Sequence, residues 1–202
     1  MRRRAFDTIF TAGGLVLTVV LLVAGGLLLW GAHFANSNVH DQLAEQQIFF
    51  PAKGSPALAP AAIGPYLNKY AGKQLLTGPQ AEAYANHFIR VHLGEVAGGQ
   101  TYAQVSTKVQ ALSASQPNSP QLTTLKAQQQ TLFQGETLRG LLLSAYGFWK
   151  IGEIARIAMI VAWCLAAVMA VLTGFGVWHL RKASPADEVF GGQQPQQVKA
   201  AA

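Results

Sequence analysis

The chain has 202 residues, of which 50% are hydrophobic and only 12% are charged, and its formal net charge is +6. Soluble domains usually carry about 25% charged residues, so this composition disfavours a wholly soluble protein. Much of the excess positive charge flanks two apolar segments, and no basic stripe interleaves with aromatic residues, so no nucleic acid partner is expected.

The first apolar segment predicts a transmembrane helix over residues 9–32, after a basic N-terminus at residues 1–8. No side chain between Thr8 and Ala32 is ionisable. About 22 helical residues at about 1.5 Å each reach about 33 Å, enough for a hydrocarbon core of about 30 Å. The sequence after Trp30 lacks a small-x-small cleavage pattern, so we expect an uncleaved anchor rather than a signal peptide.

Residues 33–150 follow the first segment and predict a mostly helical domain. A short polar helix is expected over residues 39–47, before a stretch that prolines interrupt repeatedly. The apolar spacing predicts a helix over residues 63–71, which Gly72 stops.

The later part of this domain carries stronger helix signals. Two capping boxes, each a threonine followed three residues later by glutamine, predict helix starts at Thr77 and Thr101. The glycine pair Gly98-Gly99 ends the first of these helices, and Ser119-Pro120 begins a long helical stretch. Residues 138–149 are strongly apolar. They either continue as a helix into the second apolar segment, which we favour, or lie along the membrane surface.

The second apolar segment predicts a transmembrane helix over residues 151–180 with an interfacial start. From Ile157 to Leu180 it contains no lysine, arginine, aspartate or glutamate, and its only histidine, His179, lies at its end. Glu153 and Arg156 precede this stretch and can pair on one helix face, since they are three residues apart. We place the pair at the outer interface; the alternative places it within hydrocarbon, where charges are costly and usually functional.

The orientation follows from the short basic flanks. Three arginines precede the first segment, and Arg181 and Lys182 follow the second. Positively charged flanks favour the cytoplasm, so a multi-pass plasma-membrane protein with both termini inside is expected, and residues 33–150 lie outside. Residues 181–202 are expected to form a disordered cytoplasmic tail. Tryptophans are expected to mark the outer interface (Trp30, Trp149) and the inner interface (Trp178).

Small residues recur within both segments and predict close helix packing. In the second segment they repeat every four residues: Ala158, Ala162, Ala166, Ala170 and Gly174. The first segment has Gly14, Gly25 and Gly26. Small side chains let helix backbones approach closely in lipid. We expect the two segments to pack on each other or on copies of themselves, although alanine is abundant enough for chance to produce part of the pattern.

No residue pattern predicts catalysis, a metal site or a cofactor. His87 and His92 are five residues apart, so on a helix they point away from each other, which is wrong for one metal ion. His33 and His40 could share a face, but the sequence shows no obvious ligand set with them. No Gly-x-Ser-x-Gly elbow or phosphate-binding glycine loop is present. We therefore expect a protein that is not an enzyme.

Three stretches resemble a family of uncharacterised two-span membrane proteins of high-GC Gram-positive bacteria. They begin at Ile63-Gly-Pro-Tyr-Leu, Tyr84-Ala-Asn-His-Phe and Gln134-Gly-Glu-Thr-Leu. The resemblance implies a membrane location. Some relatives carry the label aromatic ring-opening dioxygenase. Non-haem iron needs two histidines and a carboxylate at one site, and the sequence shows no such cluster.

The fold class expected is an all-α membrane protein in which two transmembrane helices flank a mostly helical extracytoplasmic domain. The leading functional hypothesis is a non-enzymatic accessory or scaffold protein that self-associates or joins a larger membrane complex. An extracytoplasmic ligand-binding or sensor module that signals through a partner is the alternative. The sequence does not specify a small-molecule ligand.

Overall fold

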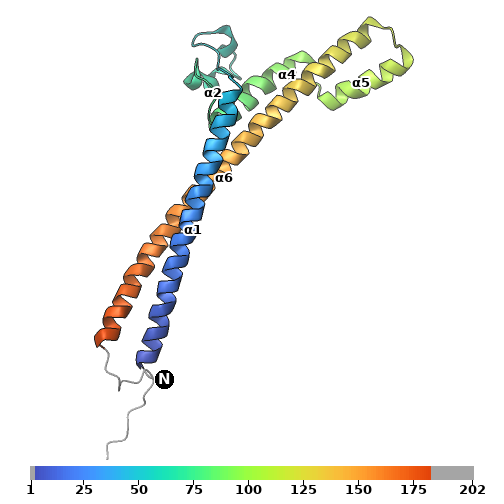
Figure 1. Ribbon diagram of the computed structural model, residues 1–202. Helices are drawn as coiled ribbons and strands as arrows, with labels where there is room; N and C mark the ends of the chain where they lie inside the picture. The colour runs from blue at the N-terminus through green and yellow to red at the C-terminus, as the bar shows by residue number, and fades with distance from the viewer. Residues whose placement is uncertain (1–2, 183–202) are drawn as a thin grey trace, which may run out of the picture. The chain divides into compact units, whose positions relative to one another are not determined.

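The computed structural model describes residues 3–182 and is all-α over this range. It contains helices and no β-strand, apart from one isolated bridge between Phe49 and Gln74. Two helices are much longer than the others, α1 (Arg3–Glu45) and α6 (Pro120–Lys182), and Figure 1 shows them in blue and from yellow to red. Each contains a stretch long and apolar enough to cross a membrane. The helical fold class is thus confirmed.

The chain divides into two compact units, and both long helices contribute to each. The apolar unit contains the residues up to Trp30 and those from Ala155 onward. The connecting unit is Gly31–Ile154. The predicted tail from residue 183 onward lies outside the described residues.

Within the apolar unit, α1 and α6 lie side by side and run in opposite directions (Figure 1). Their less exposed residues recur at alternating steps of three and four, the spacing that keeps one helix seam in contact with another. On α1 these seam residues are Asp7, Thr11, Gly14, Thr18, Leu21, Gly25 and Leu28. On α6 they are Met159, Ala162, Ala166, Met169, Thr173, Gly176 and Leu180. The remaining faces expose large apolar side chains.

The connecting unit adds short helices between α1 and α6. They are η1 (Pro56–Leu58), α2 (Gly64–Leu67), η2 (Asn68–Tyr70), α3 (Gly78–Tyr84), η3 (Ala85–Ile89), α4 (Arg90–Val96) and α5 (Tyr102–Ser115). Both predicted capping boxes, at Thr77 and Thr101, are confirmed. The predicted stop at Gly72 has φ of 71°, a left-handed conformation that glycine adopts without strain.

Two elements differ from the expectation. Residues 39–45 are the last turns of α1 rather than a separate helix. Neither proline nor glycine occurs between Ala32 and Glu45, so nothing in that stretch ends the first helix. The helix expected from Thr77 onward contains a π-helical segment, η3, between α3 and α4.

The core of the connecting unit lies where the short helices meet α1 and α6. Its largest fully buried side chains are Ile63, Leu67, Leu75, Val105 and Leu132. Two glycines allow α6 to pack closely against its neighbours, Gly78 on α3 and Gly135 on α6 itself. A Cβ atom on Gly78 would overlap the Trp149 side chain, and one on Gly135 would overlap the Leu93 side chain.

Helix α6 has no break between Pro120 and Lys182. The apolar stretch at residues 138–149 therefore continues as helix into the second apolar segment, as expected. Its position relative to a membrane stays a prediction.

Candidate functional site

The alanines and glycine that repeat every four residues in α6 divide between two environments. Ala162 and Ala166 are buried in the seam, with Ala166 only 1% exposed, whereas Ala170 and Gly174 are exposed and Ala158 is partly buried. A step of four residues turns about 40° beyond a full helical turn, so the row rotates out of a seam that follows the three-and-four spacing.

Of the three glycines of α1 predicted to pack closely, two lie against α6 and one does not. A Cβ atom on Gly14 would lie 2.6 Å from Thr173 Oγ1, and one on Gly25 would overlap the indole of Trp163. Around Gly26 no atom lies within 4 Å of such a Cβ. Gly14 and Gly25 therefore permit contact between the two helices, and Gly26 does not take part in it.

The residues predicted at membrane interfaces differ in their exposure. Trp30 and Trp178 of the apolar unit are exposed, and Lys182 Nζ lies 4.1 Å from the ring centre of Trp178. Trp149 of the connecting unit is partly buried against Gly78. Glu153 is partly buried and Arg156 is exposed.

The seam of the apolar unit contains polar atoms that were not singled out from the sequence. Asp7 Oδ2 lies 3.9 Å from His179 Nε2, and the Thr18 hydroxyl donates a hydrogen bond to the Gly14 carbonyl over 2.7 Å. The Thr173 hydroxyl is buried and has no hydrogen-bond partner among the described residues. The Thr18 bond lies within α1, whereas pairing Asp7 with His179 requires knowledge of which helix faces meet.

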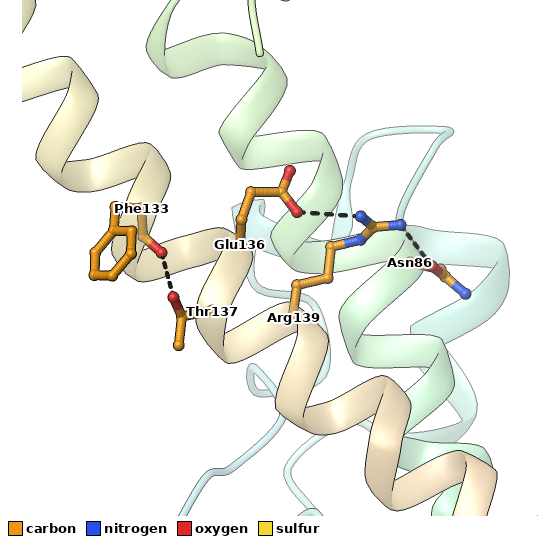
Figure 2. A network of polar contacts seen from close by, with 5 residues as sticks. All are labelled: Asn86, Phe133, Glu136, Thr137 and Arg139. Atoms are coloured by element: carbon orange, nitrogen blue, oxygen red, sulfur yellow. Dashed lines mark hydrogen bonds and ion pairs between the residues drawn. The ribbon is translucent and has the colours of Figure 1, made fainter. Parts of the chain in front are cut away.

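A second polar cluster joins α6 to the helices before α5 (Figure 2). The Arg139 guanidinium donates through Nη1 to Glu136 over 3.2 Å and through Nη2 to the Asn86 carbonyl oxygen over 3.3 Å. The amide nitrogen of Asn86 donates in turn to Glu82 over 3.0 Å. Asn86 lies within the π-helical segment, so this cluster fixes that segment against α6. Sequence reasoning missed the cluster because its members lie far apart along the chain.

An aromatic cluster lies beside the π-helical segment. Phe50 and Tyr84 meet edge to face with ring centres 5.4 Å apart, and Tyr84 stacks on Phe88 at 4.7 Å. Burial raises the pKa of the Tyr84 hydroxyl above its ordinary value of 10.0, because the charged phenolate loses hydration there. Phe50 belongs to the core of the connecting unit, and Tyr84 and Phe88 are partly buried against that core.

The histidines do not converge on one point. His87 stacks on Tyr66 with ring centres 3.5 Å apart, and His92 Nδ1 lies 2.7 Å from the Phe88 carbonyl oxygen. His40 Nδ1 lies 3.2 Å from Asp41 Oδ1. Within residues 3–182, no three histidine, cysteine or acidic side chains are placed to hold a metal ion together.

A groove of about 280 Å³ lies between α1 and α6 in the connecting unit. Buried apolar side chains form its floor: Val39, Leu43 and Leu142. One rim carries the amides of Asn38 and Gln42 on α1 and of Gln46 in the turn that follows it. The other rim is apolar and exposed, namely Leu138, Leu141 and Phe148. Ser144 and Ala145 complete the lining, so none of its side chains is ionisable.

Comparison of the chain with protein-family models, with curated proteins and with solved structures finds no match.

Proposed function

We propose that this chain is a non-enzymatic membrane protein that crosses the bilayer twice and serves as an accessory or scaffold subunit. The apolar unit supplies the observation that carries the membrane assignment. The most apolar 18-residue stretch of α1 has a mean hydropathy of 2.5, and that of α6 has a mean hydropathy of 2.4. Only 11% of the first stretch and 17% of the second are buried. A core helix of a soluble protein would bury its apolar faces, whereas lipid accepts them exposed.

The proposed orientation places both termini in the cytoplasm and the connecting unit outside. Basic residues at the start of α1 and at the end of α6 support it, because short flanks rich in lysine and arginine favour the cytoplasmic side. The resemblance to two-span membrane proteins agrees with this arrangement and stays an expectation.

The scaffold role is inferred from small residues of α6 that lie outside the contact between α1 and α6. Ala170 and Gly174 are exposed on α6, and a hollow lined by Val171, Gly174, Phe175 and Trp178 surrounds the glycine. In lipid, an exposed small-residue surface lets a further helix approach closely, which favours association with a membrane partner or a second copy.

Association is tested by native mass spectrometry of the purified chain with co-purified partners identified. We expect a homo-oligomer or a hetero-complex that the double variant Ala170→Leu/Gly174→Leu disrupts. Cys164→Leu is the matched control, since Cys164 is also exposed on α6 but lies on a different face. A monomeric wild-type protein without protein partners, or a complex that the double variant leaves intact, contradicts the scaffold proposal.

The groove in the connecting unit favours one second candidate function, a ligand-binding module. Its volume lies just below the range of about 300–1,000 Å³ typical of small-molecule sites, and its lining combines apolar side chains with a few amides. A monomer that retains a bound small molecule in the same measurement would favour this candidate.

A further inference from the structure

The two helices of the apolar unit approach closely at the end where α1 begins and α6 ends. A Cβ atom on Gly176 would lie 2.6 Å from Thr11 Oγ1, and one on Gly14 would lie 2.6 Å from Thr173 Oγ1. Each helix thus contributes a threonine and, three residues later, a glycine, and each hydroxyl lies against the glycine of the other helix. Glycines at such positions let helix backbones come within reach of short polar side chains.

This close approach brings Asp7 alongside α6. Asp7 precedes Thr11 by four residues and His179 follows Gly176 by three, so both lie about one turn beyond the glycine contact. Asp7 Oδ2 lies 3.9 Å from His179 Nε2, which is within the range of an ion pair. The side chain of Asp7 is 20% exposed and that of His179 is 49% exposed, so the carboxylate is largely covered whereas the imidazole still contacts water.

The covered oxygen of Asp7 receives no hydrogen bond. Asp7 Oδ2 is buried and has no hydrogen-bond partner among the described residues. A buried carboxylate oxygen without a donor is unfavourable, and a positive charge beside it lowers that cost. A protonated His179 supplies this charge, whereas a neutral imidazole does not. The carboxylate is therefore compensated only when the histidine carries its second proton.

The other charged groups at this end do not change their charge near neutral pH. Residues 3–4, two arginines, precede Asp7 by about one turn, and residues 181–182, an arginine and a lysine, follow His179. The acidic residues at 187–188 lie outside the described residues. Arginine and lysine stay positive and aspartate ordinarily stays negative between about pH 5 and 8, whereas histidine ordinarily changes its charge in this range.

We propose that Asp7 and His179 form a pH-sensitive clasp, which holds this end of α1 and α6 together when His179 is protonated and releases it when His179 is neutral. The clasp is complete at mildly acidic pH and is lost as pH rises through the range in which histidine loses its proton. In the orientation proposed above, this end faces the cytoplasm, but the clasp itself does not depend on that orientation or on the scaffold role.

The opening of this end is measured by pulsed electron paramagnetic resonance on the full chain in phosphatidylcholine nanodiscs. Spin labels at Ala5→Cys and Val177→Cys, in a Cys164→Ser background, occupy exposed positions of the two helices. Between about pH 5.5 and about pH 8 we expect the separated population to increase about two- to fivefold, the usual effect of a partly exposed ion pair. Labels at Leu22→Cys and Val168→Cys, exposed and nearer the middle of the helix pair, should show the same distance at both pH values.

Three variants identify the groups responsible. Asp7→Asn and His179→Gln each remove one partner of the clasp, so each should abolish the pH response, and combining them should add nothing. His179→Lys keeps a positive charge throughout this pH range, so this end should stay together at both pH values. His40→Gln is the matched control, because His40 Nδ1 lies 3.2 Å from Asp41 Oδ1 in the connecting unit, and it should retain the full response.

Each alternative result overturns the clasp. Equal distances at both pH values in the unsubstituted pair would show that this end does not respond to protons. A response that persists in Asp7→Asn would assign the pairing of His179 to another acidic group, and a response lost in His40→Gln would place the sensor in the connecting unit. A change of the same size at Leu22 and Val168 would mean that the whole helix pair separates rather than one end. An end that opens at about pH 8 in His179→Lys would exclude charge as the cause.

Discussion

Gly25 of α1 lies directly against the indole ring of Trp163 of α6, so that a side chain at Gly25 would overlap the ring. The next residue, Gly26, has open space where its side chain would be. Substitutions at Gly25 and Gly26 both remove a helical glycine, but only a substitution at Gly25 disturbs the contact between the two helices.

We expect Gly25→Leu to destabilise the paired helices relative to Gly26→Leu by about 1–3 kcal/mol, the usual cost of overpacking a close contact. Both substitutions gain the same helix propensity, so the difference reports the contact with Trp163. Unfolding of the purified protein in mixed micelles, followed by tryptophan fluorescence, measures it. Equal stability of the two variants would show that Gly25 is not in the seam.

Ala166 and Ala170 are predicted to have different roles although both belong to the same four-residue repeat. Ala166→Leu should lower the stability of the helix pair, because this alanine is 1% exposed and has no room for a larger side chain. Ala170→Leu should leave stability unchanged and weaken association, because Ala170 is exposed. Thermal unfolding together with oligomeric state in detergent separates the two effects. The prediction is wrong if both variants change the same property.

Arg139 should stabilise the connecting unit through its bonds to Glu136 and Asn86. We expect Arg139→Lys to lower the free energy of unfolding by about 1–2 kcal/mol, because a lysine cannot reproduce the two-sided guanidinium contact and hydrogen bonds to charged groups contribute about this much. Arg90→Lys, at an exposed position of α4, should have little effect. Thermal unfolding and amide hydrogen exchange across residues 82–96 measure the change. Unaltered exchange around Asn86 would contradict a role in fixing the π-helical segment.

Tyr84 predicts a loss of stability at alkaline pH. Its folded-state pKa is raised above 10.0 by burial, so folding holds the proton more tightly than the unfolded chain does. The contribution of Tyr84 to the free energy of unfolding is therefore complete below the pKa of the unfolded state and is lost as pH rises through the pKa of the folded state. Tyr84→Phe should remove this part of the pH dependence and retain the ring contacts. Unfolding measured from neutral to strongly alkaline pH tests it, and identical profiles for both proteins would exclude the effect.

Local signals in the sequence predicted the helices well, because each signal acts on its own neighbours. The capping boxes at Thr77 and Thr101 supply donors and acceptors within one turn, and the glycine at Gly72 adopts the conformation that its position needs. The continuation of α1 to Glu45 was not predicted. The change from apolar to polar residues suggested a new helix, although no residue there breaks the first one.

Contacts between distant segments could not be predicted in the same way. The seam is set by which faces of α1 and α6 meet, so a strict four-residue spacing cannot separate Ala166, which is buried there, from Gly174, which is exposed. Arg139 and Asn86 are 53 residues apart, so no local pattern links them. The groove likewise combines two helices whose facing surfaces the sequence does not specify.

We propose that α1 and α6 each cross the membrane, with the connecting unit outside and both ends inside. It is tested most directly by labelling single cysteines on intact cells with a maleimide that cannot cross membranes, in a Cys164→Ser background. We predict labelling of Ser115→Cys on intact cells, and labelling of Ala5→Cys and Ser184→Cys only after permeabilisation. Labelling of either terminal cysteine on intact cells, or protection of Ser115→Cys, would overturn this two-span topology.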